Sequence, residues 1–215
     1  MTIRVKICGI IHPEDAELAV AAGADLVGLN FVPESPRVLE LDMAARIVEV
    51  IAGRAETVGV FRDASPEEIE RVLRRVDLDR LQFHGDETEE EVEAVDLPVI
   101  KAIKGADLEA ADEFPGTIVL LDHPSGGGGS GEAWEWSAAS GLIESGHDVI
   151  LAGGLGPENL REALEGVGDV PPWGVDVATG VEGEDRRKDA GKLARFIEIA
   201  RELEVGDSAE SDKLS

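Results

Sequence analysis

Cysteine is almost absent from this sequence: Cys8 is the only one in 215 residues, so no disulfide can form within the chain. A lone thiol suits a reducing compartment, and we expect a cytoplasmic protein. The sequence shows no secretion signal and no apolar stretch long enough to span a membrane. The four histidines, His12, His84, His123 and His147, are too scattered for a zinc site, and no P-loop motif is present.

Basic residues are also scarce, since 20 lysines and arginines stand against 46 aspartates and glutamates, a formal net charge of −26. Such a surface repels nucleic acid and anionic lipid, so neither a nucleic acid nor a membrane is expected as a partner. Abundant acid with little lysine resembles proteins of very salty cytoplasm, where about 1 M salt screens charges within about 3 Å. A merely acidic protein of ordinary salt is the alternative.

Apolar residues make up 43% of the chain and recur with clear periodicity, which predicts one domain with a sizeable core. Eight short apolar segments are each followed by a helical pattern, which indicates βα units that close into a single (β/α)8 TIM barrel. A doubly wound open sheet is the rival, but the G-x-G-x-x-G motif after its first strand is missing. The predicted strands are Ile3–Gly9, Asp25–Phe31, Thr57–Phe61, Arg80–His84, Pro98–Ile103, Thr117–Asp122, Asp148–Ala152 and Trp173–Val177.

Helices are expected after each strand, and Ser65-Pro66-Glu67-Glu68 has the form of a capping box with proline at the first helical position. The glycine-rich stretch 126–131 lies in a βα loop, where flexibility suits substrate entry. We predict a barrel over residues 1–205 and a loose polar tail over 206–215. The predicted helices are Pro13–Ala22, Leu41–Ile51, Ser65–Arg75, Thr88–Val95, Asp107–Glu113, Ser137–Glu144, Pro157–Leu164 and Asp189–Leu203.

Residues at the carboxyl ends of the strands are the candidates for chemistry, because catalytic groups of such barrels lie at that mouth. Alternation puts Lys6 and Cys8 on the inward face of the first strand, and Asp122 ends the sixth strand with the same parity. A thiol and a carboxyl would thus face each other. His84 and Asp176 are expected to point inward as well, toward the substrate. Lys6 and Lys101 are predicted as inward ion-pair partners of such acids.

Each of these residues also has a structural interpretation that the sequence leaves open. Cys8 would then be a small buried hydrophobe, Asp122 a turn or helix cap, and His84 a hydrogen-bonded core histidine. Asp176 would be a caged buried acid.

Two glycine-containing loops predict an anion site. Gly153 and Gly154 follow the seventh strand, and Thr179 and Gly180 follow the eighth, which is the common phosphate site of this fold. Glycine lets backbone N–H groups approach an anion, and a short helix there would aim its positive end at it. Arg37 lies in the long loop after the second strand, where a guanidinium suits a substrate carboxylate; an exposed surface arginine is the alternative.

Taken together, these motifs resemble phosphoribosylanthranilate isomerase over nearly the whole chain, to residues 188–189. A KICG start combined with Q-x-H-G and LLD is specific to that family. The matching segments are Lys6–Gly9 (KICG), Val58–Phe61 (VGVF), Gln82–Gly85 (QFHG), Leu120–Asp122 (LLD), Gly128–Gly131 (GGSG), Gly153–Leu155 (GGL) with Pro157 and Asn159, Val175–Val177 (VDV) and Gly180–Glu182 (GVE).

The resemblance implies an Amadori rearrangement in tryptophan biosynthesis, acting on a small phosphosugar without metal or cofactor, in a monomer or homodimer. Cys8 would be the general base at C2 of the sugar, and Asp122 the general acid at the ring oxygen. Arg37 would meet the anthranilate carboxylate, and the two glycine loops the phosphate. Glu132 departs from the family, which usually has lysine there, so cationic help from that loop is in doubt.

These roles require the thiol to lose its proton more readily than a free thiol, and the carboxyl to hold its proton more firmly than a free carboxyl. The two demands conflict in part, so coupled titration is expected. Two alternatives stay open: a related phosphosugar barrel such as the histidine-pathway isomerase, which uses two aspartates, and a barrel that binds a phosphorylated ligand without catalysis.

Overall fold

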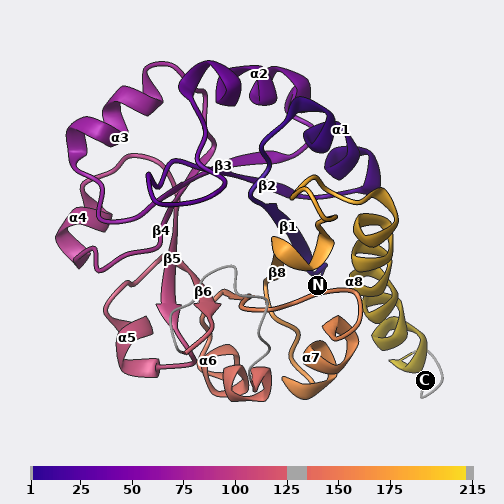
Figure 1. Ribbon diagram of the computed structural model, residues 1–215. Helices are drawn as coiled ribbons and strands as arrows, with labels where there is room; N and C mark the ends of the chain where they lie inside the picture. Colours follow the sequence, from indigo (N-terminus) through magenta and orange to yellow (C-terminus); the bar gives the residue numbers. More distant parts are fainter. Residues whose placement is uncertain (1, 125–134, 212–215) are drawn as a thin grey trace.

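The computed structural model describes residues 2–124 and 135–211, with side chains described through residue 202. Within these residues, eight parallel strands pair in sequential order and close into a barrel, which confirms the predicted fold class. Figure 1 shows the helices as a ring around the strands. The predicted entry loop over 126–131 and Glu132 lie outside the described residues. The strands are β1 (Arg4–Cys8), β2 (Leu26–Asn30), β3 (Glu56–Phe61), β4 (Arg80–Phe83), β5 (Val99–Lys104), β6 (Ile118–Asp122), β7 (Val149–Leu151) and β8 (Gly174–Val177).

The helices begin at the signals that the sequence carries. Ser65 accepts a hydrogen bond from the backbone of Glu68 at 3.4 Å, and the Glu68 carboxylate accepts one from the Ser65 backbone at 2.9 Å, so the predicted capping box is confirmed. The helices are α1 (Pro13–Ala22), α2 (Leu41–Ile51), α3 (Pro66–Leu73), α4 (Glu89–Glu93), α5 (Leu108–Asp112), α6 (Ser140–Glu144), α7 (Leu160–Gly166) and α8 (Ala190–Ser211), with 3-10 helices η1 (Trp136–Ala139) and η2 (Thr179–Val181).

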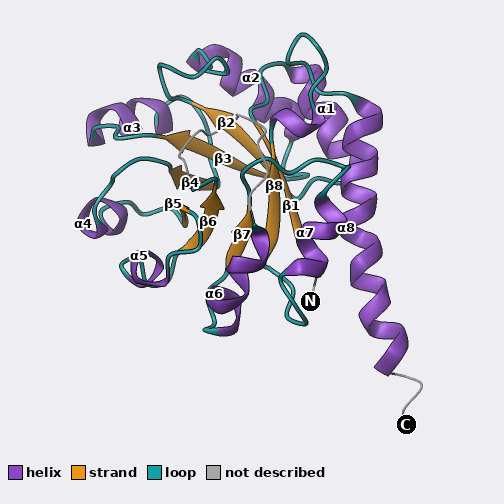
Figure 2. Ribbon diagram, turned by 60° about the horizontal axis from the view of Figure 1, so that its bottom comes forward, coloured by secondary structure: helices purple, strands orange, loops and turns teal. Residues whose placement is uncertain are grey.

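Helix α8 is longer than the sequence pattern predicts. It continues to Ser211, well into the segment from Gly206 for which a loose tail is expected, and Figure 2 shows it extending past the barrel. The mobility of this segment stays a prediction. None of the described helices is both long and apolar enough to cross a membrane.

The barrel has two separate apolar regions because alternate residues of each strand face opposite sides. One lies between the strands and the helices, and the other fills the barrel interior. The interior region consists of Leu26, Val58, Ile100, Ala102, Ile118, Leu120, Ile150 and Ala152.

Charged and aromatic side chains gather around Trp173, at the amino-terminal end of the barrel. The guanidinium of Arg4 lies 5.0 Å from the Trp173 ring centroid and that of Arg80 lies 5.9 Å from it. Both arginines pair with Glu56. These side chains therefore lie at the end of the barrel opposite to the carboxyl ends of the strands.

The prediction that Lys101 points into the barrel is wrong. Its neighbours Ile100 and Ala102 are interior residues, so alternation directs Lys101 toward the helical layer. There its ammonium group bonds Glu87 Oε2 and the Gly85 carbonyl, each at 2.7 Å. Both faces of a barrel strand are buried, so alternation alone does not say which face is the inner one.

We expect Ile150→Ala to lower the free energy of unfolding by about 2–5 kcal/mol, because Ile150 is only 1% exposed inside the barrel and its truncation leaves a cavity. Leu108→Ala is the control, since Leu108 is 44% exposed and should change stability by no more than about 0.5 kcal/mol. Urea unfolding measures both values. Equal small losses would contradict the tightly packed interior.

Candidate active site

A cavity of about 730 Å³ opens at the carboxyl ends of the strands, within the size range of small-molecule sites. The structure brings together all nine residues for which the sequence predicts a site role, since every one of them lines this cavity. They are Cys8, Arg37, His84, Asp122, Gly153, Gly154, Asp176, Thr179 and Gly180.

Cys8 is the last residue of β1, is half-buried and has a free thiol. The chain turns directly after it at Gly9, whose φ of 71° lies in the left-handed region that favours glycine. A Cβ at Gly9 would lie 2.3 Å from Cδ of Arg37. The glycine of the KICG motif therefore gives the chain its turn and leaves the space through which Arg37 reaches the cavity.

Asp122 ends β6 and is held by a chain of polar side chains from β4. Its Oδ2 lies 3.1 Å from His84 Nε2, and His84 Nδ1 lies 2.9 Å from Gln82 Nε2. With the Gln82 amide donating to Nδ1, the Nε2–H of His84 points at Asp122. The other amide atom, Gln82 Oε1, is buried without a hydrogen-bond partner among the described residues. The contacts from Gln82 through His84 thus fix the Asp122 carboxyl at the cavity wall.

The expectation that Asp122 holds its proton more firmly than usual is wrong for the free protein. Burial raises the pKa of Asp122, but the hydrogen bond and charge of His84, with further help from His123, bring the pKa below its ordinary value. The carboxyl is therefore ionised at neutral pH before substrate binds.

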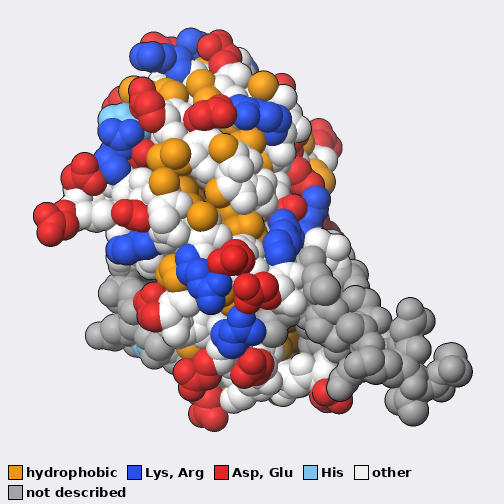
Figure 3. Space-filling view, turned by 90° about the vertical axis from the view of Figure 1, so that its right-hand side faces the viewer, with side chains coloured by type: hydrophobic (Ala, Val, Ile, Leu, Met, Phe, Trp, Pro, Cys, Tyr) orange, Lys and Arg blue, Asp and Glu red, His pale blue; other side chains and the backbone are white. Residues whose placement is uncertain are grey.

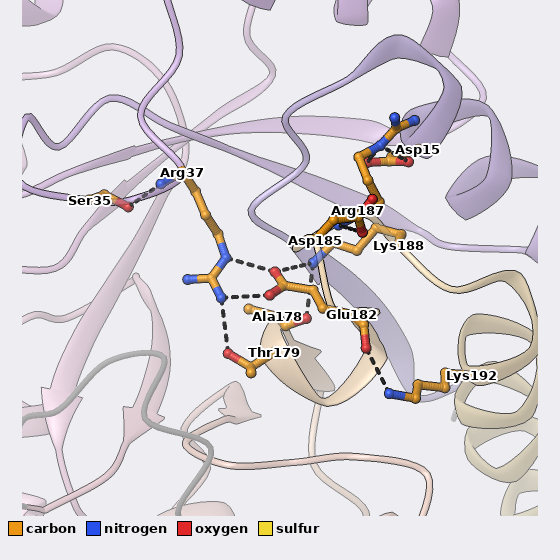
Figure 4. A network of polar contacts seen from close by, with 10 residues as sticks. All are labelled: Asp15, Ser35, Arg37, Ala178, Thr179, Glu182, Asp185, Arg187, Lys188 and Lys192. Atoms are coloured by element: carbon orange, nitrogen blue, oxygen red, sulfur yellow. Dashed lines mark hydrogen bonds and ion pairs between the residues drawn. The ribbon is translucent and has the colours of Figure 1, made fainter.

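Arg37 is fixed by an acid that the sequence analysis gave no role. Its Nε lies 2.7 Å from Glu182 Oε1, and its Nη2 lies 2.9 Å from Glu182 Oε2 and 3.0 Å from Thr179 Oγ1 (Figure 4). A two-point contact of this kind fixes the plane of the guanidinium. Among the described residues, Nη1 has no hydrogen-bond partner, and Figure 4 shows it directed away from Glu182.

Lys188 is a second cation in contact with Glu182. Its buried ammonium bonds Glu182 Oε1 at 3.1 Å and the Ala178 carbonyl at 2.9 Å. Burial raises the pKa of Glu182, but the hydrogen bond from Arg37 and the charges of Lys188 and Arg37 outweigh it and lower the pKa below its ordinary value. Burial lowers the pKa of Lys188, which Glu182 opposes only in part.

The two glycine loops lie side by side because β7 and β8 are neighbours in the barrel. Gly153 and Gly154 have φ angles of 74° and 87°. A Cβ at Gly180 would lie 2.2 Å from the Leu155 carbonyl oxygen, so the two loops touch backbone to backbone. They form one continuous rim of peptide groups on the cavity.

Asp176 lies deeper, on β8, and bonds the ammonium of Lys6 at 2.8 Å. The predicted pairing of an inward lysine with an inward acid is thus present for Lys6. Neither Glu182, in the matching GVE segment, nor Lys188 has a predicted role, although an acid three residues after Thr179 is a signal for a partner of Arg37. Across the described residues, no group of three or more His, Cys, Asp or Glu is arranged to hold a metal ion.

Comparisons with known proteins agree on one family. The family model described as N-(5'-phosphoribosyl)anthranilate (PRA) isomerase matches residues 5–199. The N-(5'-phosphoribosyl)anthranilate isomerase of Trichlorobacter lovleyi is 41% identical over 93% of this chain and 98% of its own length. That of Thiobacillus denitrificans is 43% identical over 94% and 99%.

Solved structures give the same result. The phosphoribosyl anthranilate isomerase of Thermus thermophilus superposes with a TM-score of 0.85 at 40% identity, covering 94% of this chain and 100% of its own. A phosphoribosyl anthranilate isomerase in complex with reduced 1-(o-carboxyphenylamino)-1-deoxyribulose 5-phosphate superposes with a TM-score of 0.83 at 35% identity, covering 94% and 100%.

We expect His84→Leu to raise the pKa of Asp122, because burial remains and the main opposing partner is lost. A folded-state pKa below the unfolded one gives stability above the unfolded pKa that is lost as the pH falls through the folded value. Above the unfolded pKa, ionisation of Asp122 should therefore contribute less stability in the variant than in the parent. Carbon-13 NMR titration of the Asp122 carboxyl measures the shift.

The matched control is His147→Leu, which breaks a surface pair 3.0 Å long with the exposed Asp112. It should leave the Asp122 titration where it is. An unchanged Asp122 titration in His84→Leu would contradict the role given to His84.

Proposed function

The chain belongs to the family of N-(5'-phosphoribosyl)anthranilate isomerases, and we propose that its mouth cavity performs the reaction with Cys8 as general base and Asp122 as general acid. It is an isomerase of tryptophan biosynthesis that converts N-(5-phosphoribosyl)anthranilate into 1-(2-carboxyphenylamino)-1-deoxyribulose 5-phosphate. The observation that carries the assignment is that a thiol and a carboxyl, from strands on different sides of the ring, line one cavity.

The rearrangement needs an acid and a base at different atoms of the sugar. Protonation of the ring oxygen lets the bond from that oxygen to C1 break, which leaves a C1–nitrogen double bond. Removal of the C2 proton then gives an enolamine. Loss of its enol hydroxyl proton and addition of a proton at C1 give the amino ketose. Asp122 supplies the proton to the ring oxygen, and the Cys8 thiolate removes the proton from C2. No oxidant or reductant enters, since the product is an isomer of the substrate.

Asp122 must hold a proton when the ring opens, although it is ionised in the free site. That proton comes from solvent when substrate binds and raises the proton affinity of the Asp122 carboxyl, which His84 continues to hold in place at 3.1 Å. The substrate brings a phosphate and a carboxylate into the cavity, and like charges raise the pKa of a nearby acid. Substrate binding thus prepares its own general acid.

Arg37 is the proposed partner of the anthranilate carboxylate. Glu182 and Thr179 hold two of its nitrogens and fix its plane, while Nη1 points away from them. A guanidinium held in this way binds a carboxylate with little further loss of side-chain freedom.

Gly153, Gly154, Thr179 and Gly180 are the proposed phosphate site. Their support is the contact between the two loops and the left-handed glycines, which let peptide N–H groups approach an anion. Because the whole protein is acidic, close peptide dipoles must provide the attraction that the overall field does not. A non-catalytic phosphosugar-binding barrel would need this rim but no thiol opposite a carboxyl.

We expect Cys8→Ala and Asp122→Ala each to reduce kcat by at least about 100-fold, because each removes one proton-transfer group. The reduced product analogue should still bind within tenfold, since its carboxylate and phosphate contacts remain. The assay follows the decrease in the fluorescence of the N-phosphoribosylated anthranilate after substrate is made in situ. Asp112→Ala, at an exposed aspartate, is the control and should keep full activity.

Full activity in Cys8→Ala would contradict the base assignment alone. A parent protein that binds the analogue but shows no fluorescence decrease would contradict the function and favour the non-catalytic barrel. Complementation of a tryptophan-requiring strain that lacks this step gives the same test in cells.

We further propose that the chain works in the cytoplasm of a salt-rich cell; the oligomeric state, monomer or homodimer, stays a prediction. The support for the salt-rich setting is the net charge of −26, whose self-repulsion opposes the compact state unless salt screens it. Figure 3 shows one face of the molecule, on which acidic and basic side chains surround exposed hydrophobic ones. On this face the two signs of charge are mixed. A thiol that acts as a base must also stay reduced, which fits the cytoplasm.

Raising KCl to the molar range should increase Tm by several degrees, measured by circular dichroism. Exchanging exposed glutamates near helix carboxyl ends for lysine, as in Glu49→Lys/Glu93→Lys/Glu165→Lys, should reduce this salt response, because repulsion falls and lysine is favourable at those ends. A Tm that does not depend on salt would contradict the salt adaptation and favour an ordinary acidic protein.

A further inference from the structure

Lys6 is a fully buried cation for which the reaction described above has no role. It has 0% exposure and lies on the inward face of β1, two residues before Cys8. Its ammonium bonds Asp176 at 2.8 Å. Burying an ion pair costs free energy that an apolar pair of the same size avoids, so a lysine inside an apolar barrel asks for an explanation beyond stability.

The Lys6 ammonium and the Cys8 sulfur lie against the same small patch of backbone. A Cβ on Gly28 of β2 would lie 2.8 Å from Cys8 Sγ and 3.2 Å from Lys6 Nζ. Glycine at this position leaves the space that both groups fill. Burial lowers the pKa of Lys6, but the charges of Asp176 and Cys8, and hydrogen bonds with both, raise it above its ordinary value.

Two further cations act on the same sulfur. Arg37 and Lys188 both interact electrostatically with Cys8, and Glu182 pairs with each of them (Figure 4). The group around the sulfur thus consists of three cations and two carboxylates. The cations are Lys6, Arg37 and Lys188, and the carboxylates are Asp176 and Glu182. When all five are ionised, one positive charge is left over beside the Cys8 sulfur.

Other groups around the cavity lie on different elements. The neighbouring strand β2 presents the uncharged Gly28 and Asn30. On the β4 and β6 side, the charged pair His84 and Asp122 is already joined at 3.1 Å. Lys6 shares a strand face with the sulfur and reaches it from inside the barrel, whereas Arg4 on the same face pairs with Glu56.

We propose that Lys6 is a positioning residue for Cys8, whose buried ammonium group stabilises the thiolate at the cavity floor. The catalytic meaning of this interaction rests on the proposed role of Cys8 as base, but the charge interaction itself does not. The proposal involves only the gain or loss of a proton at the Cys8 sulfur and the Lys6 nitrogen, and no covalent bond between heavy atoms changes.

The test uses the fact that Cys8 is the only cysteine, so alkylation by iodoacetamide reports on it alone. Only the thiolate reacts, so the rate against pH gives a midpoint for thiolate formation. In Lys6→Met this midpoint should rise by about 1–3 pH units, the range expected when an opposite charge at contact distance is removed. The pH profile of kcat should shift in the same direction.

Lys101→Met is the matched control. Lys101 is also a buried strand lysine, 3% exposed, paired with a carboxylate at 2.7 Å, but it faces the helical layer. Both variants leave an acid without its lysine partner, half-buried Asp176 in one and buried Glu87 in the other, so both should lose stability. Only Lys6→Met should move the alkylation midpoint, which separates a role at the sulfur from a structural one.

A reciprocal measurement covers the case in which Lys6→Met does not fold. If the thiolate and ammonium stabilise each other, Cys8→Ala must lower the pKa of Lys6 by linkage. Carbon-13 NMR of labelled lysine measures it, with Lys101 as the internal reference that should not move. An alkylation midpoint unchanged in Lys6→Met, or a Lys6 titration unchanged in Cys8→Ala, would overturn the proposal. Neither measurement involves turnover, so a wrong base assignment would show separately, as activity in Cys8→Ala.

Discussion

In a closed parallel barrel every strand delivers the residue at its carboxyl end to the same opening, and the cavity of this chain depends on that constraint. Cys8 and Asp122 are far apart in sequence and on strands that are not neighbours, yet both end at this mouth. Trp173 and its two arginines, Arg4 and Arg80, lie at the opposite end. An acid and a base can therefore address two ends of one sugar without meeting each other.

A strongly acidic protein that binds a substrate with a phosphate and a carboxylate must solve an electrostatic problem locally. Three cations held by acids do so: Glu182 holds Arg37 and Lys188, and Asp176 holds Lys6. Lys6 and Lys188 are buried, and Arg37 is half-buried. Their charges act at short range through weakly screening surroundings, whereas the surface acids lie in screening solvent. The attraction at the site and the net charge of the molecule are thus set by different groups.

Much of this arrangement could be predicted from sequence because it follows from periodicity. The eight βα units, the capping box at Ser65 and the inward pairing of Lys6 all depend on local patterns. The face of Lys101 could not be predicted, since both sides of its strand are buried and its partner Glu87 lies in a loop. The ionisation of Asp122 was also beyond reach, because it depends on a histidine from another strand. The contact between Glu182 and Arg37 joins residues 145 positions apart, which a local pattern does not show.

The most direct test of the account is a crystal structure of this chain with the reduced product analogue bound. The account predicts that the phosphate lies on the rim formed by the two glycine loops and that C2 lies beside the Cys8 sulfur. The oxygen on C4, which was the ring oxygen of the substrate, should lie within about 2.6–3.2 Å of an Asp122 oxygen. The account would be contradicted if the Cys8 sulfur and the Asp122 carboxyl lay at the same end of the sugar, or if Cys8 were turned away from C2.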